Sequence, residues 1–477
     1  MRDSQAGSSK LESNTLNSQG SPEAPLAFSA IEYSDPMTET ASDSALHENH
    51  LHDPAAPRVK KRTIFAWSLW DWGSAAFQAV VTTFVFTVYI TSASFGPEEQ
   101  TSVALGATLS IAGIAVALFA PLFGRLTDAT GHRKHSLAVT TGIVVACTAL
   151  MVLVAPAPEY FVLGLVLLAV GNIAFEFASV NYYSMLTQLS TTRNVGRVSG
   201  FGWGMGYLGG IVLLTIVLVG FILPDTGWFG VTSDGGWNVR VAMVVCALWF
   251  AVFAIPTFFA VPEISADRDR RVVGVVAGYR AIFRSIGQLW RSSRHTLFFL
   301  IASAIFRDGL AGIFTFTGIV ASLSFGFDPA TVIMFAIAAN VISGLATILG
   351  GVVEDRFGAK NVMTVSLVLL VIALILMFAL APLGAPAFWT VGLFATIFVG
   401  PVQSSSRSFL ARLTPPGKEG EMFGLYATTG RAVSFLAPLA FTVAVALGGS
   451  TIFGIIGIAL VLLVGLALLI PVRVPTA

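Results

Sequence analysis

The sequence predicts an all-α membrane protein whose twelve transmembrane helices form two six-helix, pseudo-symmetric halves. Three observations lead to this fold class: the composition, a series of long apolar stretches and an internal repeat. Of the 477 residues, 55% are hydrophobic and only 11% are charged, whereas soluble domains carry roughly 25% charged residues. This composition excludes an ordinary soluble enzyme.

The first 57 residues differ from the rest of the chain. They carry two basic and nine acidic side chains and have no sustained apolar period. Such a segment cannot bury enough apolar surface to offset the entropy lost on ordering, so we expect 1–57 to be a disordered acidic tail. No secretory signal pattern is visible at its start, which predicts that the tail stays on the cytoplasmic side.

From Thr63 onward, apolar stretches alternate with short polar breaks. A helix of about 20 residues crosses the hydrocarbon core, and helix is favoured over strand because an isolated span must satisfy its own backbone hydrogen bonds in lipid. The predicted spans are residues 64–92, 103–123, 137–155, 160–183, 200–223, 240–261, 296–322, 330–351, 362–381, 387–405, 422–446 and 451–471.

Basic residues separate the two sides of the membrane. They lie before the first span and in every second loop after it, and the intervening loops hold none apart from Arg240 at the edge of a span. Cytoplasmic loops are enriched in Lys and Arg, so both termini are expected to be cytoplasmic, with an even number of spans.

The chain also repeats itself. The segment after the second span, residues 124–134 (GRLTDATGHRK), is echoed after the eighth by residues 351–360 (GVVEDRFGAK), and glycines that follow the fourth span recur after the tenth. Both echoes preserve sidedness, which predicts two parallel halves, 58–261 and 296–477, related by an axis along the membrane normal. The Gly-rich fifth span favours close helix contacts within one chain, so we expect a monomer.

The segment between the halves, residues 262–295, is a basic linker with its own period. Apolar residues recur at helical spacing from Val276 to Trp290, and Arg280, Arg284 and Arg291 lie on another face. This pattern predicts an amphipathic helix in the cytoplasmic headgroup layer. It could serve as a connection between the halves, as a regulatory element, or as both.

The repeated motif resembles the signature of the major facilitator superfamily between spans two and three. Its candidate gate residues are Gly124, Asp128, Gly131, Arg133 and Lys134 in the first half, and Gly351, Asp355, Gly358 and Lys360 in the second. The glycines allow sharp turns and close helix contacts, and the Asp128 carboxylate could cap the positive N-terminus of a neighbouring helix. Such contacts would latch the cytoplasmic side in the closed state.

A narrower resemblance is to the vacuole-effluxer family of major facilitators. It rests on residues 66–77 (AWSLWDWGSAAF) in the first span and on residues 403–426, which begin with QSSSRS and end with FGLY. The resemblance implies efflux of a small polar solute such as an amino acid, across the cytoplasmic membrane of a bacterium. The fifth span lacks the proline of the superfamily's antiporter motif.

Ionisable residues inside spans are costly and therefore functional candidates. The candidates for a substrate or proton site are Asp71, Glu176, Arg307, Asp308 and Arg431. The resemblance implies that spans one, four, seven and ten line a central cavity, so the three carboxylates should face one space. We expect Asp71 to pair with Arg431 across the halves and Glu176 to load and release protons. The alternatives are buried structural pairs and charges that reach the headgroups.

Neutral polar residues could complete a pocket for an amino acid, whose carboxylate and amine each need a partner. These residues are Gln78, Asn172, Asn181 and Asn340. Trp67, Trp70 and Trp72 could form amphipathic walls, although tryptophans near the start of a span are more often interfacial anchors.

The sequence therefore predicts a secondary transporter that works by alternating access, with protons as a candidate coupling ion. No phosphate-binding loop of the Gly-x-x-x-x-Gly-Lys-Ser/Thr type is present. Two cysteines in apolar runs and six histidines in the tail or loops favour neither a metal site nor an enzyme. No cofactor or nucleic-acid partner is expected. The alternative is a non-transporting sensor or scaffold that binds a partner through the tail and the linker.

Overall fold

A computed structural model describes Leu51 and residues 59–263 and 274–473, and all of these residues belong to one unit. The predicted disordered tail lies outside the described residues except for Leu51. Among the described residues, twelve helices are long and apolar enough to span a membrane, which confirms the predicted number.

The helices alternate in direction along each half. In the first half they are α2 (Lys61–Ala75), continued by the π-helical η1 (Ala76–Phe84) and α3 (Phe86–Ile90), then α4 (Glu98–Thr130), α5 (Arg133–Leu150), α6 (Phe161–Ser184), α7 (Leu186–Leu189), α8 (Val195–Val217) with η4 (Leu218–Ile222), and α9 (Trp237–Ala260). In the second half they are α11 (Arg294–Phe325), α12 (Pro329–Phe357), α13 (Ala359–Ala379), α14 (Ala385–Leu413), α15 (Glu419–Val433), α16 (Leu436–Gly448) and α17 (Gly454–Leu469). We call the membrane side at which α2 begins the basic side, and the opposite one the far side.

Several helices continue beyond the apolar stretches that predicted them. On the basic side α4 runs to Thr130 instead of residue 123, and α14 runs to Leu413 instead of residue 405. Helical hydrogen bonds persist through the polar boundary until a residue stops them, such as Gly131, which has a φ of 69°. Hydropathy marks the part of a helix in lipid, so it underestimates helices that extend past the lipid.

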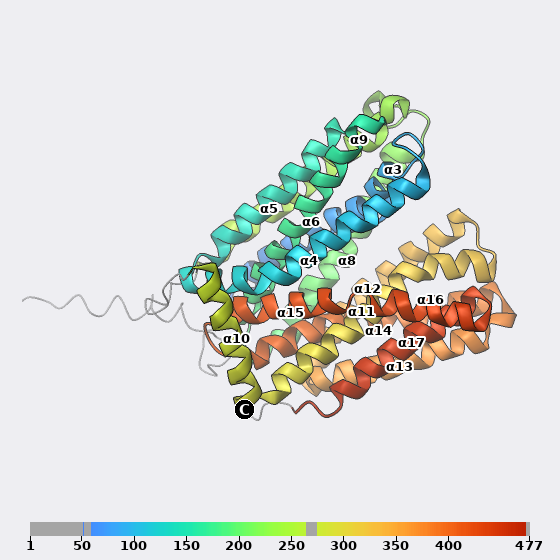
Figure 1. The fold of residues 1–477 in the computed structure, drawn as a ribbon. Coiled ribbons are helices and arrows are strands. Elements are labelled where there is room, and N and C mark those ends of the chain that lie inside the picture. Colours follow the sequence, from blue (N-terminus) through green and yellow to red (C-terminus); the bar gives the residue numbers. More distant parts are fainter. Residues whose placement is uncertain (1–50, 52–58, 264–273, 474–477) are drawn as a thin grey trace, which may run out of the picture. The chain divides into compact units, whose positions relative to one another are not determined.

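The two halves form separate bundles that meet along two seams (Figure 1). One seam joins α4 to α15, and the other joins α8 to α12. On the far side, η1 and η4 pack within the first half, and α16 packs against α11 and α17 of the second half. The contacts between the halves are thus concentrated toward the basic side.

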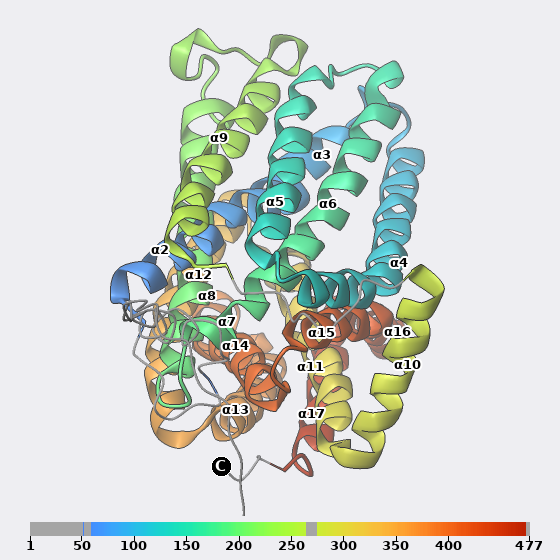
Figure 2. The same ribbon diagram turned by 90° about the vertical axis from the view of Figure 1, so that its left-hand side faces the viewer.

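The linker contains α10 (Val275–Ser292), which lies on the basic side beside α4 and α11 (Figure 2). It therefore touches one helix from each half.

Candidate functional site

The first seam is held by the carboxylate of Asp128 on α4. Its Oδ1 and Oδ2 accept hydrogen bonds from the backbone N–H groups of Gly420 (2.8 Å) and Glu421 (2.9 Å), at the N-terminus of α15. Arg133 lies 2.6 Å from both Asp128 and Glu419 and is 4% exposed. This arrangement, here called the first latch, is the helix-cap contact that the sequence led us to expect.

The second seam repeats this geometry with the halves exchanged. Asp355 on α12 accepts hydrogen bonds from the backbone N–H groups of Gly196 (2.8 Å) and Arg197 (3.3 Å), at the N-terminus of α8. The Arg197 guanidinium also lies 3.0 Å from Asp355, but its side chain is 60% exposed. In this second latch the cation therefore faces solvent, whereas Arg133 is buried.

Glycines bring the backbones together at both latches. A Cβ on Gly124 would lie 1.9 Å from the carbonyl oxygen of Gly420, and a Cβ on Gly351 would lie 2.4 Å from that of Gly196. No side chain fits at either position. The gate candidates at the ends of the motifs have other contacts: Gly131 and Gly358 take positive φ, the Lys134 backbone N–H donates to Glu263, and the Lys360 ammonium donates to the carbonyl of Ile470.

A buried ion pair lies between the seams. Asp71 on α2 accepts hydrogen bonds from the Tyr182 hydroxyl (2.9 Å) and from Arg407 on α14 (3.4 Å). Arg407 is 0% exposed, and it also donates to the hydroxyl and the carbonyl of Ser199 on α8. The predicted pairing of Asp71 with Arg431 is therefore wrong. The prediction placed Arg407 in a loop, whereas the structure places it inside α14.

Aromatic rings enclose this pair. The rings of Trp67 and Trp70 stack on Tyr182 with centroids 4.4 and 4.3 Å apart, and both tryptophans are at most 1% exposed. The Arg407 guanidinium lies 5.4 Å from the Trp67 ring and 5.1 Å from that of Trp203. The expectation that Trp67 and Trp70 are interfacial anchors is therefore wrong, because they form the wall of a buried cage.

Arg431 pairs instead with Glu176, which joins α15 of the second half to α6 of the first. The side chains of Arg431 and Glu176 are 31% and 23% exposed, so neither charge is fully enclosed by protein. Asn172, one turn from Glu176, accepts a further hydrogen bond from Arg431 at 3.5 Å. Three of the predicted site residues thus come together at an accessible point between the halves.

The remaining candidates do not join this cluster through any described contact. Asp308 is 7% exposed and accepts a 2.6 Å hydrogen bond from the backbone N–H of Ala437, at the N-terminus of α16. Arg307 lies over the ring of Tyr426, 3.4 Å from its centroid, and donates to the Tyr426 carbonyl. Both residues therefore connect α11 to the span formed by α15 and α16.

The neutral candidates are scattered. Gln78 is exposed on η1, and Asn340 is half-buried and donates to the carbonyl of Ala336 on its own helix. Asn181 is fully buried, and within the described part of the chain its side-chain oxygen has no hydrogen-bond donor. Of the four amides, Asn172 is the one that contacts the Arg431–Glu176 pair.

Sequence reasoning did not single out every buried carboxylate: Glu419 and Glu421 are 2% and 3% exposed, and Glu354 is buried further still. Glu354 is 0% exposed and accepts hydrogen bonds from Ser405 and Arg412 on α14 at 2.8 and 2.9 Å. Thr127 occupies the equivalent place in the first copy of the motif. The glutamate at this position of the second copy, where the first copy has a threonine, was the signal in the sequence that could have identified Glu354.

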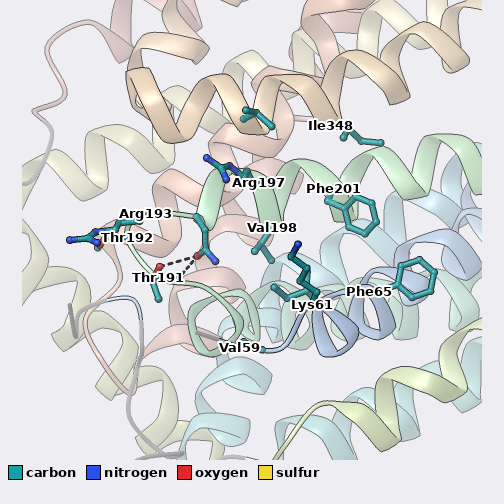
Figure 3. A pocket seen from close by; sticks show the side chains of 13 residues that line it. Val59, Lys61, Phe65, Thr191, Thr192, Arg193, Arg197, Val198, Phe201 and Ile348 are labelled. Carbon is teal, nitrogen blue, oxygen red and sulfur yellow. Dashed lines mark hydrogen bonds between the residues drawn. The ribbon is translucent and has the colours of Figure 1, made fainter. Parts of the chain in front are cut away.

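A groove of about 750 Å³ opens beside the second latch (Figure 3). Its wall combines apolar side chains from α2, α8 and α12 with Lys61, Arg193 and Arg197. It lies on the basic side and contains none of the predicted substrate residues.

Comparison with known proteins identifies the family and the fold. The family model described as vacuole effluxer Atg22 like matches residues 93–477. The MFS-type transporter YxiO of Bacillus subtilis is 25% identical over 408 residues, which cover 85% of this chain and 93% of that protein. Autophagy-related protein 22-1 of Aspergillus fumigatus is 26% identical over 270 residues, and the chain spans less than half of its length (42%).

Solved structures share the fold. The proton:xylose symporter XylE aligns with a TM-score of 0.66 at 12% identity, covering 85% of this chain and 93% of that chain. A bacterial homologue of the iron transporter ferroportin, in an outward-facing state, aligns with a TM-score of 0.62 at 12% identity, covering 87% and 99%. Both neighbours are transporters rather than enzymes.

Proposed function

We propose, from the premise that the chain belongs to the Atg22-like vacuole effluxer family of major facilitator transporters, that it exports a small zwitterionic solute such as an amino acid. The family and the fold make the chain an integral membrane transporter. The substrate class, the direction of transport and the coupling to protons are the parts that we add.

One observation carries the choice of substrate: the accessible ion pair between Arg431 and Glu176. An α-amino acid presents a carboxylate and an ammonium group a short distance apart. Its carboxylate can replace Glu176 as the partner of Arg431, and its ammonium can replace Arg431 as the partner of Glu176. A partly exposed pair contributes only about 0–1 kcal/mol, so exchanging it for a zwitterion costs little.

The same pair supports proton coupling. Protonation of Glu176 removes its charge, which weakens its hold on Arg431 and on a bound ammonium group. Because Glu176 lies on α6 and Arg431 on α15, its protonation state also affects how firmly the halves adhere. Alternating access then follows if release of the pair accompanies opening of the two latches.

The test is transport by the full-length protein in proteoliposomes. A panel of labelled amino acids, sugars and organic ions is offered with and without a proton gradient, to the wild type and to Glu176→Gln. We expect gradient-driven accumulation of an amino acid, lost in Glu176→Gln, with exchange of labelled for unlabelled substrate retained. The matched control is Glu99→Gln, which removes the same charge from an exposed site at the far end of α4.

Two outcomes would contradict the proposal. If Glu176→Gln transports at the wild-type rate and with the wild-type dependence on the proton gradient, Glu176 is not part of the site. No flux of any panel member by folded protein would exclude amino-acid export and favour the sensor or scaffold alternative.

A further inference from the structure

The linker helix α10 has an apolar surface that the described part of the chain leaves uncovered. Ile282 and Leu289, at 4% and 9% exposure, face the protein. Val276, Phe283 and Trp290, spaced seven residues apart, are 76%, 70% and 52% exposed. Residues seven apart lie on one side of a helix, so the three are aligned along α10, and we call this line of residues the apolar stripe.

Arginines border this stripe. Arg280, Arg284 and Arg291 are all exposed and lie next to it on the helical surface. Arg294, at the start of α11, lies over the Trp290 ring with its guanidinium 5.5 Å from the centroid. An apolar stripe beside a row of cations is the pattern of a helix that rests at a membrane interface, where it binds anionic headgroups.

Contacts with α4 show that α10 lies beside the membrane-spanning part of that helix. The Tyr279 hydroxyl donates a 2.8 Å hydrogen bond to the carbonyl of Leu118, and Gly278 lies so close to Leu122 that a Cβ would be 2.4 Å from it. Leu118 precedes the end of α4 at Thr130 by about 18 Å, at 1.5 Å per residue. It therefore belongs to the apolar part of that span.

We propose that α10 is a binding surface for anionic phospholipid on the basic side of the membrane. The apolar stripe contacts the acyl chains near the headgroups, and the phosphate groups are bound by Arg280, Arg284 and Arg291. Because α10 is tied to α4 by Tyr279, bound lipid acts on the helix that carries Asp128. This inference does not depend on the identity of the transported solute.

The experiment uses purified full-length protein in neutral detergent. Thermal unfolding is followed with a thiol-reactive fluorophore, since both cysteines, Cys147 and Cys246, are buried in the folded state. Phosphatidylglycerol, phosphatidylcholine or inorganic phosphate is added to the wild type and to R280Q/R284Q/R291Q. The matched control, K60Q/R62Q/R356Q, removes the same charge from exposed positions on the basic side.

We expect phosphatidylglycerol to raise the unfolding temperature of the wild type and the control, and the arginine triple variant to need at least about tenfold more of this lipid for the same rise, since each cation near an anionic surface contributes on the order of a fivefold change. Inorganic phosphate should not reproduce the effect, because it cannot occupy the apolar stripe. F283S should weaken the response to phosphatidylglycerol while it leaves unfolding without lipid unchanged.

Several results would overturn the proposal. Equal stabilisation by phosphatidylcholine and phosphatidylglycerol would show that binding does not require an anionic headgroup. Equal stabilisation by inorganic phosphate would show that binding does not require a lipid. A dimer that dissociates in F283S would show that the stripe binds a second copy of the chain instead. If the triple variant does not fold, R284Q alone and added salt test the same charges, and an unchanged lipid response in both would contradict the proposal.

Discussion

Arg407 and Asp71 face each other across the two halves, with a guanidinium nitrogen of Arg407 3.4 Å from the Asp71 carboxylate. Arg407 belongs to the second half, yet its described polar partners, Asp71 and Ser199, belong to the first. Its side chain is fully buried. Separation of the halves at this level therefore has to remove a charge from its partner or carry water to it.

Arg407→Gln should lower the stability of the protein strongly. The change leaves the buried Asp71 carboxylate without its cation, and breaking a buried pair in this way costs about 3–5 kcal/mol. The measurement is the midpoint of unfolding in mixed detergent micelles. The exposed Arg356→Gln serves as control, and equal midpoints for the two variants would show that the pair contributes no stability.

Asp128→Ala should destabilise the protein more than Asp355→Ala, although the two latches share their geometry. In the first latch the buried Arg133 loses one of its two carboxylate contacts, which costs about 3 kcal/mol. In the second latch the exposed Arg197 regains water, and the loss is about 1 kcal/mol, the value of a helix cap. The same unfolding assay compares them, and a larger loss for Asp355→Ala would contradict this reading.

Gly124→Leu should open the basic side. A side chain at this position collides with the backbone of Gly420, so the first seam cannot close. Spin labels at His132 and Arg356, which are exposed and belong to opposite halves, should report longer distances in double electron–electron resonance. Gly106→Leu on the same helix is the control, because a Cβ there meets nothing within 4 Å. Identical distance distributions for both variants would exclude this steric mechanism.

Asp308→Ala should reduce stability by about 1 kcal/mol, with Asp308→Asn close to the wild type. The carboxylate caps the N-terminus of α16 through the Ala437 N–H, and the asparagine oxygen can accept the same hydrogen bond. Transport in proteoliposomes should persist in Asp308→Asn. If this variant has normal stability but loses proton-driven transport, the prediction is wrong and Asp308 takes part in proton coupling.

Much of the fold could be predicted because its signals are local. Apolar length predicts spans, and the repeated Gly and Asp positions predict the two halves and the capping by Asp128. The partners of buried charges could not be predicted in this way, because residues that pair, such as Asp71 and Arg407, are far apart in sequence. The sequence identified Glu176 and Arg431 as candidates but assigned Arg431 to the wrong carboxylate.

Arg407 was missed for a physical reason. Three serines precede it and another follows it, so the end of α14 is too polar to be distinguished from a loop by hydropathy. Small residues around an arginine also allow other helices to approach closely. Here α8 approaches α14, and the Ser199 hydroxyl donates a 2.7 Å hydrogen bond to the Ser404 carbonyl. That signal could have indicated a buried site.

The crossing of bare backbones at Gly124 with Gly420, and at Gly351 with Gly196, also limits how the two halves can slide past each other. Backbone atoms have no rotamers with which to yield, so each crossing fixes one spacing and one register of the two helices that meet there. With one such crossing in each seam, the closed basic side is a single, reproducible position of the halves and not a range of loosely packed ones.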